Sequence, residues 1–359
     1  LTVKSAVVIA SIFECAGAIL MGSHVTKTIR KGIADYECFE DSPEIFIYGC
    51  FSVLISVTLW LFLASYFEMP VSTTHSCVGG MIGMTMLAGG MDCVIWYKQT
   101  DSFPYVGGVS GIVLSWFLSP IFSAIVAGSI FFITRLTVLR RENSFDKSYV
   151  LLPVLVGMTL LLNSFFIIYK GGKGIGLDDI SEIKAIFISI GIGMLSSILI
   201  IPFIPYLKNN VERRFVDNNS PERQQCIVNE DIVITEDMSK CKKCITNIRN
   251  NINYDVRREL IIDDKVNTIH DNSEKFDIKT EESFKYLQIF TAICDSFSHG
   301  ANDVANAIGP YAAIVSIYMN DGDLDKKVDM GDHAYWILSM GGIGITFGLL
   351  LYGYKIIKA

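Results

Sequence analysis

Long apolar segments constrain the fold of this chain more than any other feature of its sequence. A helix that crosses a lipid bilayer needs about 20 mostly apolar residues, and eight segments approach or exceed that length. Only 19 % of the 359 residues are charged, whereas soluble domains contain about 25 %. The sequence therefore predicts an all-α protein that crosses a membrane several times, and it argues against a soluble enzyme. The eight segments are residues 5–25, 45–67, 70–88, 106–139, 149–169, 186–207, 284–318 and 335–357.

Three of these segments have lengths that do not suit one straight span. Segment 106–139 contains Pro120 and segment 284–318 contains Pro310, and an interior proline removes a helix hydrogen bond and clashes with the preceding turn. We expect both segments to be broken at these prolines. Segment 70–88 is short and rich in glycine, which suits a half-helix or a re-entrant hairpin as well as a full span.

Charge is concentrated in one part of the chain. Residues 208–283 contain 29 of the 67 lysine, arginine, aspartate and glutamate residues, and they include few aromatic side chains. Such a composition is typical of segments that are disordered or only loosely structured. The predicted organisation is a membrane region at 1–207, a polar insert at 208–283 and a second membrane region at 284–359.

Loop charges predict the orientation in the membrane. The short basic connection at Arg140 and Arg141 is placed in the cytoplasm by the positive-inside rule, and the acidic connection at 321–332 is placed outside. Eight crossings that begin in the cytoplasm satisfy both assignments and put the polar insert in the cytoplasm. The basic stretch 26–31 then lies outside, against the rule.

Cysteine use and net charge exclude other classes of function. The nine cysteines are scattered and most lie in apolar segments, so we interpret them as small core residues and not as a disulfide framework. Cys241 and Cys244 form a C-x-x-C pair in the polar insert, but no second pair follows at zinc-ligand spacing. We expect no cofactor and, at a net charge of −7, no nucleic-acid partner.

One polar cluster occupies a single predicted helix face. Asp295, His299, Asn302, Asp303 and Asn306 are spaced so that they share one side of a helix. A carboxylate at the bilayer centre costs about 2.5–3.5 kcal/mol on insertion scales, so this face must meet protein, water or an ion. Carboxylate and amide oxygens suit a hard cation such as sodium. The alternative is a polar seam that only joins helices.

A second cluster follows a predicted helix break. Pro70 resists continuation of the preceding helix, and Ser72 or Thr73 is a suitable N-cap for the next one. A helix that begins at membrane depth directs unpaired backbone N–H groups at that point. The hydroxyls of Ser72, Thr73 and Thr74, with His75 beside them, add donors without a fixed positive charge. This pattern suits an anion that must be released again, such as phosphate, or else a simple cap at the membrane surface.

A lone acidic residue marks the first apolar segment. Glu14 is the only charged residue in its interior, and an intramembrane ionisable group indicates a functional role by default. The alternative is a glutamate near the interface whose carboxylate reaches water.

These motifs resemble those of the inorganic phosphate transporter family, the sodium-dependent phosphate symporters. Residues 300–307, Gly-Ala-Asn-Asp-Val-Ala-Asn-Ala, match the most specific motif of that family, and residues 70–75, Pro-Val-Ser-Thr-Thr-His, match its second motif. Glu14 and the basic turn at 28–32 are similar to the glutamate-bearing span of the family. The resemblance implies an inverted-repeat transporter that binds sodium and phosphate between a transport unit and a scaffold unit.

The resemblance also implies roles for individual residues. Phosphate is expected to contact Ser72, Thr73, Thr74, Asn302 and Asp303. Sodium is expected to contact Asn302, Asp303, Asn306 and Ser72, and no other metal is expected. The candidates for coupling transport to ion binding are Glu14, His75, Asp295 and His299.

The chain departs from the family in one respect. Family members carry each motif twice, once in each repeat, whereas this sequence contains each motif once. Gly17 and Gly22 share their spacing and apolar surroundings with Gly348 and Gly353 near the other end. We therefore expect an internal fragment that begins and ends at equivalent points of two repeats.

The sequence predicts import of inorganic phosphate coupled to sodium by an integral protein of the plasma membrane. Proton coupling through Glu14, His75, Asp295 or His299 is an alternative within transport. A receptor or scaffold without transport activity is another, and whether the chain forms a homodimer is left open. An intramembrane hydrolase using Ser72, His75 and Asp295 is disfavoured, because Ser72 and His75 lie three residues apart on one helix and no oxyanion hole is evident.

Overall fold

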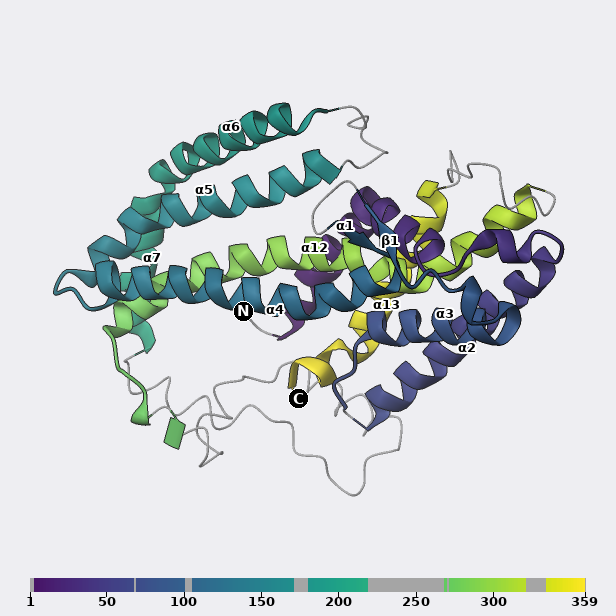
Figure 1. Ribbon diagram of the computed structural model, residues 1–359. Helices are drawn as coiled ribbons and strands as arrows, with labels where there is room; N and C mark the ends of the chain where they lie inside the picture. The colour runs from purple at the N-terminus through teal and green to yellow at the C-terminus, as the bar shows by residue number, and fades with distance from the viewer. Residues whose placement is uncertain are drawn as a thin grey trace, which may run out of the picture.

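Helices form almost all of the described structure (Figure 1). The computed structural model describes residues 3–67, 69–100, 105–170, 180–218, 268–269, 271–320 and 334–358, and the structural statements below concern these residues. The helices are α1 (Val3–Lys31), α2 (Pro43–Tyr66), α3 (Thr73–Gly89), α4 (Gly108–Thr134), α5 (Ser144–Lys170), α6 (Glu182–Ile200), α7 (Ile204–Asn218), α12 (Ile278–Met319) and α13 (Ala334–Lys358). Short 3-10 helices lie at Tyr36–Phe39, Met91–Cys93 and Ile201–Phe203, a π-helical turn at Arg135–Leu139, and an antiparallel hairpin at β1 (Lys98–Gln99) and β2 (Val106–Gly107).

Five of the described helical segments are long and apolar enough to cross a membrane. Helix α3 has 17 residues, which is shorter than a full span, and α13 is apolar over the described stretch Tyr335–Leu351. These helices confirm the prediction of a largely helical membrane protein. Five of the eight expected crossings correspond to one of these segments. The five segments are Lys4–Ser23, Pro43–Tyr66, Gly108–Leu139, Ser144–Tyr169 and Glu182–Arg213.

The prediction that two long segments break at proline is wrong. Helix α4 runs through Pro120, and α12 is one helix of 42 residues with Pro310 in its interior. Pro310 is fully buried, and its neighbours Ile308 and Ala312 belong to a buried cluster with Ile337 of α13. Packing of this kind holds the helix together across the missing hydrogen bond, as is common for proline in membrane helices.

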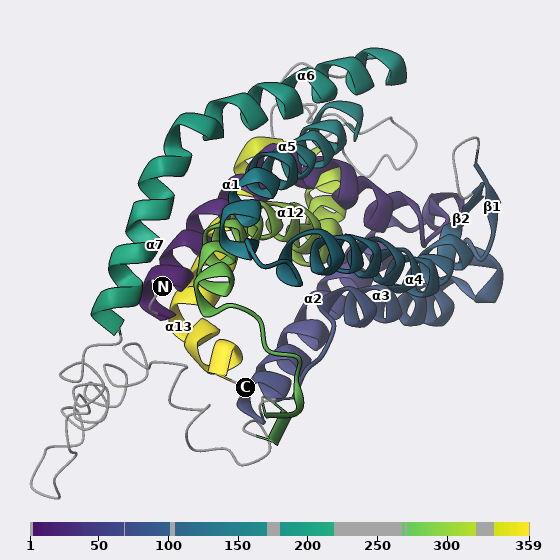
Figure 2. The same cartoon turned by 90° about the vertical axis from the view of Figure 1, so that its left-hand side faces the viewer.

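Helix α12 connects two groups of helices (Figures 1 and 2). Its N-terminal part packs against α5 and α7, and its C-terminal part packs against α1, α2, α3 and α13. At the α5 contact the hydroxyl oxygens of Ser144 and Thr280 lie 2.8 Å apart, and Ser283 Oγ donates to Ser148 Oγ at 2.8 Å. These pairs give the buried serine and threonine hydroxyls of this α5–α12 contact their hydrogen-bond partners, whereas the buried hydroxyls of Tyr149 and Tyr286 have no partner within the described residues.

An ion pair ties the segment before α12 to the end of α4. The carboxylate of Glu274 accepts hydrogen bonds from the guanidinium groups of Arg135 and Arg140, the Arg140 Nε bond being 2.8 Å. The hydrogen bond from Arg140, together with Arg135, holds the pKa of Glu274 below its ordinary value. This contact lies in the basic connection that loop charge places in the cytoplasm.

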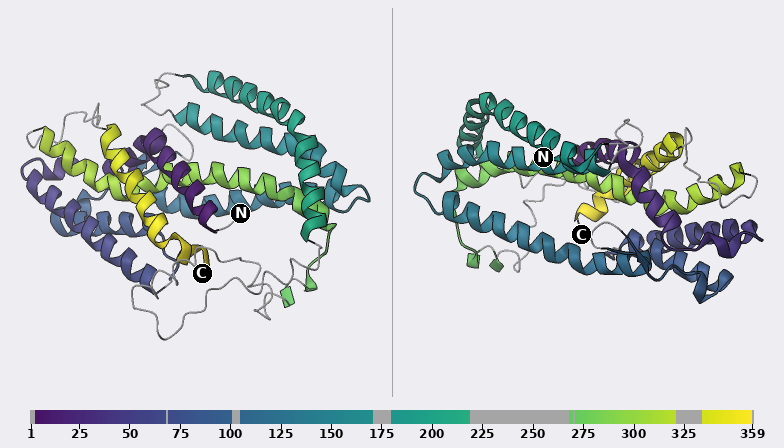
Figure 3. Two further views of the ribbon diagram at one scale, coloured as in Figure 1. Left: turned by 180° about the vertical axis from the view of Figure 1, so that it is seen from behind. Right: turned by 45° about the horizontal axis from the view of Figure 1, so that its top comes forward.

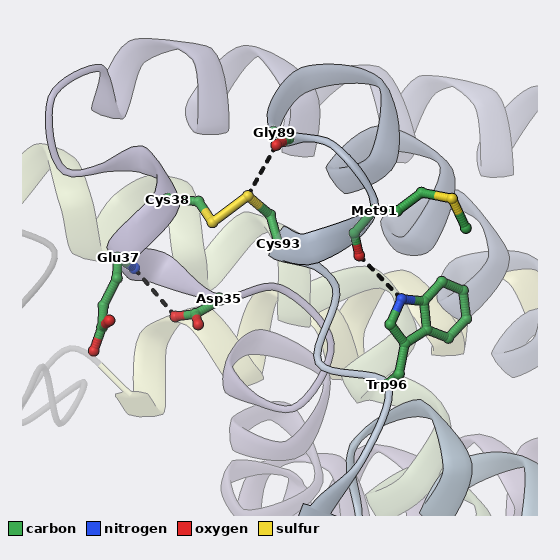
Figure 4. The surroundings of a disulfide bond; sticks show 7 residues. All are labelled: Asp35, Glu37, Cys38, Gly89, Met91, Cys93 and Trp96. Atoms are coloured by element: carbon green, nitrogen blue, oxygen red, sulfur yellow. Dashed lines mark hydrogen bonds between the residues drawn. A yellow bond between two sulfur atoms is a disulfide. The ribbon is translucent and has the colours of Figure 1, made fainter.

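One pair of cysteines departs from the interpretation of all of them as core residues. A disulfide links Cys38, which lies between α1 and α2, to Cys93, which lies between α3 and α4, with the Cα atoms 5.9 Å apart (Figure 4). Both cysteines lie in short 3-10 helices outside the α-helices, and only the return of α3 alongside α2 brings them together. Cys50 and Cys77 are fully buried, as expected of core residues.

The disulfide belongs to a larger contact between residues 33–39 and 89–96, which we call the cystine clasp. Asp35 N donates to the Cys93 carbonyl oxygen at 2.8 Å, and Ile95 N donates to the Ile33 carbonyl oxygen at 2.9 Å. Phe39 of the clasp is buried against Phe46 of α2, with ring centroids 5.1 Å apart. The clasp therefore fixes the C-terminal end of α3 to the connection that follows α1.

Two helices reach into the polar insert. Helix α7 runs on to Asn218, and α12 begins at Ile278, so both helices extend into residues 208–283. The pair Cys241 and Cys244 lies outside the described residues, as does the acidic connection 321–332.

Candidate functional site

The two polar clusters found in the sequence meet in space. The side-chain amide of Asn306 on α12 donates to the hydroxyl oxygens of Thr73 and Thr74 on α3, both at 3.0 Å. The same nitrogen lies 3.2 Å from Asp303 Oδ1. Asn306 is only 5 % exposed, whereas Thr73, Thr74 and Asp303 are partly exposed. Residues more than 230 positions apart in the sequence thus form one polar centre.

The backbone at the start of α3 positions the hydroxyls. Ser72 is extended and is the N-cap of the helix, and its Oγ accepts a hydrogen bond from His75 N at 3.3 Å. Thr73 and Thr74 therefore lie in the first helical turn, where backbone N–H groups have no partner within the helix. Hydroxyl and N–H donors converge there, which is the arrangement that binds anions at helix N-termini.

A histidine bridges two carboxylates beside this centre. His299 Nε2 lies 3.0 Å from Asp303 Oδ2, and His299 Nδ1 lies 3.4 Å from Glu14 Oε1. Glu14 is on α1 and is 7 % exposed. An imidazole that carries two protons can donate to one carboxylate through each nitrogen. The polar chain therefore extends from Glu14 through His299, Asp303 and Asn306 to the threonine hydroxyls.

Two glycines bring Glu14 to this position. A Cβ atom built at Gly300 would overlap the carbonyl oxygen of Glu14, and one built at Gly17 would overlap the carbonyl oxygen of Phe297. Helices α1 and α12 consequently cross backbone to backbone, as small residues permit in membrane helices. Figure 3 shows α1 and α13 crossing α12, and both helices contact it.

Several expected site residues lie outside the polar chain. Asp295 and Asn302 are exposed and make no hydrogen bond or ion pair within the described part of the chain. The ring of His75 lies against that of Trp116 of α4 in a tilted arrangement, with ring centroids 3.9 Å apart, instead of joining the carboxylates. Ser72 Oγ is engaged as the helix cap. The structure thus unites Glu14, His299, Asp303, Asn306, Thr73 and Thr74.

Two residues near the site were not identified from the sequence. Trp116 covers His75, and Asn163 of α5 lies with its Oδ1 3.3 Å from Ser298 Oγ, next to His299. Asn163 carries a recognisable signal, because it is a carboxamide within an apolar segment. Trp116 carries none, since tryptophan is common in membrane helices and only the fold places it over His75.

The arrangement offers oxygen ligands and anion donors side by side. The carboxylates of Asp303 and Glu14 can neutralise cations, and the threonine hydroxyls with the first turn of α3 can donate to an anion. Within the described residues, no group of three or more histidine, cysteine, aspartate or glutamate side chains is arranged to hold a metal ion. Membrane-length helices around a helix N-terminus and a charged helix face define a membrane transporter.

Comparison with known proteins identifies the kind of transporter. The model of the phosphate transporter family matches residues 1–359, so the chain belongs to the phosphate transporter family, and it is not an enzyme. The sequence is 27 % identical to the phosphate-repressible phosphate permease pho-4 of Neurospora crassa, over 99 % of this chain and 76 % of that protein. It is 33 % identical to sodium-dependent phosphate transporter 1 of Felis catus, over 61 % of this chain and 31 % of that protein.

A solved structure supports the same assignment. A solved structure described as the sodium-dependent phosphate transporter superposes on this chain with a TM-score of 0.69 at 28 % sequence identity. The match covers 100 % of this chain and 68 % of the chain in that structure. The family resemblance seen in the sequence is therefore confirmed, as are phosphate transport as the family's activity and the membrane location. Membership of a transporter family also excludes the intramembrane hydrolase.

Proposed function

We propose that this protein carries inorganic phosphate across the membrane in symport with sodium. The observation that supports this function best is the contact of Asn306 with Thr73 and Thr74 directly beside Asp303. Asn306 thus contacts both the proposed anion site and a carboxylate that attracts cations. Asn302 and Ser72 lie next to the same groups in sequence and complete the proposed set of ligands.

The proximity of Asp303 to the anion donors gives a physical reason for coupling. A bare carboxylate repels phosphate, whereas a sodium ion bound to it removes the repulsion and adds an attraction. Phosphate carries about one to two negative charges near neutral pH, and an inside-negative potential opposes its entry by about 2.3 kcal/mol per charge per 100 mV. Two or more sodium ions carried along would offset this cost.

Asn306 has a separate role in the proposed site. Its amide protons point to the oxygen atoms of Thr73 and Thr74, so the protons of both hydroxyls remain available for phosphate. We expect Asn306→Ala to raise the KM for phosphate by about tenfold or more, since a buried polar group that loses its partner costs about 1–3 kcal/mol. Radiolabelled phosphate uptake over a range of phosphate concentrations measures this.

The matched control is Asn320→Ala, at the C-terminal end of the same helix, where the side-chain amide of Asn320 donates to the Ser316 carbonyl oxygen. Its KM is expected to equal that of the wild type. An unchanged KM in Asn306→Ala would contradict the role given to Asn306.

Replacing external sodium by choline at constant pH tests the coupling ion. Uptake into proteoliposomes is expected to fall to the background level, because choline is too large to be bound by carboxylate and amide oxygens at this junction. Full uptake in choline that responds to a pH gradient would instead favour proton coupling. Proton coupling is kept as the second candidate because His299 contacts both Glu14 and Asp303, which places three ionisable side chains together.

The fold also supports the proposed orientation. Helix α4 begins at the cystine clasp, where Val109 N donates to the Ile95 carbonyl oxygen at 2.9 Å, and it ends at the Arg135 and Arg140 contacts with Glu274. Disulfides persist in oxidising compartments, and basic connections favour the cytoplasm. Both rules therefore favour a cystine clasp on the outer side of the membrane and a polar insert in the cytoplasm. The proposed location is the plasma membrane.

A further inference from the structure

We propose that the Cys38–Cys93 disulfide is a thiol-exchange site on the outer face, where an external thiol attacks Cys38 and thereby loosens the end of α3. This disulfide lies at the opposite end of α3 from Thr73 and Thr74. The consequence for transport rests on the proposed function, whereas the exchange chemistry does not.

The two cysteine residues of the disulfide differ in exposure. Cys38 is exposed, whereas Cys93 is only 6 % exposed. Figure 4 shows Cys93 enclosed by the turn from Gly89 to Trp96, where Trp96 Nε1 donates to the Met91 carbonyl oxygen at 3.0 Å. Because thiol exchange depends on which sulfur an attacking thiolate can reach, the attack falls on Cys38.

The exchange balances with an external thiol as the reductant. A thiolate bonds to Cys38 Sγ, the bond to Cys93 Sγ breaks, and Cys93 leaves as a thiolate that takes a proton from water. A second thiolate attacks the mixed disulfide, releasing Cys38 and forming the disulfide of the external thiol. Cys93 Sγ lies 3.0 Å from the Gly89 carbonyl oxygen, so the new thiol has an acceptor in place.

Opening the disulfide removes only the covalent part of the clasp. The hydrogen bonds of Asp35 and Ile95 remain, and Ile33 and Val94 stay buried in the same core cluster as Ala305 of α12. We therefore expect the last turn of α3 and the following turn to open more often without unfolding of the helix bundle. Such local opening lowers the fraction of molecules in which α3 is correctly held against α12.

Labelling tests the exchange site independently of transport. Cells that express the protein are treated with a membrane-impermeant maleimide before and after an impermeant phosphine, and the labelled peptides are mapped by mass spectrometry. Wild-type Cys38 and Cys93 are expected to be unlabelled until reduction. Cys93→Ser is expected to be labelled at Cys38 without reductant, and glutathione disulfide should form a mixed disulfide there. Cys38→Ser is expected to leave Cys93 almost unlabelled.

Hydrogen exchange and uptake test the consequence. Reduction is expected to accelerate amide exchange in residues 89–96 and to raise the KM for phosphate by about threefold, as when about a third of molecules remain binding-competent. The double variant Cys38→Ser and Cys93→Ser should show both changes and no further response to reductant. Cys294→Ser, which removes a cysteine outside the disulfide, should respond as the wild type does.

Three results would overturn the proposal. They are labelling of both cysteines without reductant, preferential labelling of Cys93 over Cys38, and unchanged exchange in residues 89–96 after complete reduction. Absence of phosphate uptake in the untreated wild type would refute the proposed function instead, while the labelling and exchange results would still decide the disulfide proposal.

Discussion

Asp303→Asn is expected to abolish sodium-dependent phosphate uptake while leaving surface expression intact. The substitution preserves the shape of the side chain but removes the charge that faces His299 and Asn306. The His299 and Asp303 side chains are partly exposed to solvent, so loss of their ion pair alone costs about 1 kcal/mol or less. The larger expected effect is the loss of the carboxylate proposed to bind sodium. The experiment is carried out in the complete protein, with radiolabelled phosphate uptake measured alongside surface biotinylation.

Asp295→Asn provides the comparison. Asp295 lies two turns earlier on the same helix, is exposed, and makes no hydrogen bond or ion pair within the described part of the chain. Its substitution is expected to retain most of the uptake. Equal losses in both variants would show that negative charge along α12, and not the contact at Asp303, determines transport.

Gly300→Ala is expected to destabilise the protein strongly. The added methyl group would overlap the backbone carbonyl of Glu14, and a backbone atom cannot move aside by a change of rotamer. Overpacking costs about 1–3 kcal/mol in general, and the rigid contact here favours the upper end. Thermal unfolding in detergent, followed by size-exclusion chromatography, measures the effect, and uptake should fall because Glu14 is displaced from His299.

Gly344→Ala in α13 is the matched control, because a Cβ atom there has open space around it. Removing a glycine from a helix interior stabilises the helix by about 1 kcal/mol, so the midpoint of unfolding should stay the same or rise. A Gly300→Ala protein with wild-type stability would show that α1 and α12 do not cross in contact.

Much of the candidate site could be predicted from the sequence because its signals are local. The spacing of His299, Asp303 and Asn306 follows the helical period, and a helix start at Thr73 follows from a proline and a capping serine. Ionisable and polar residues are also conspicuous in apolar surroundings. The structure brings the two clusters into contact through the hydrogen bonds from Asn306 to Thr73 and Thr74.

Features that depend on the tertiary arrangement could not be predicted in this way. Whether Pro310 breaks α12 depends on the neighbours that pack around it, and α13 supplies them. Cys38 and Cys93 are 55 residues apart, and only the hairpin of α2 and α3 aligns them. His75 and Asp295 have the chemistry of site residues, but the fold turns His75 to Trp116 and leaves Asp295 exposed.

Helix α12 is continuous, so a tilt at one point along it moves its far end. From the crossing at Gly300 to the first residue, Ile278, the helix extends about 33 Å at 1.5 Å per residue. A tilt of about 5° around that crossing would displace the far end by about 3 Å. Because the hydroxyl pairs of Ser144 and Ser148 anchor that end to α5, a tilt of α12 at the Gly300 crossing also moves α5.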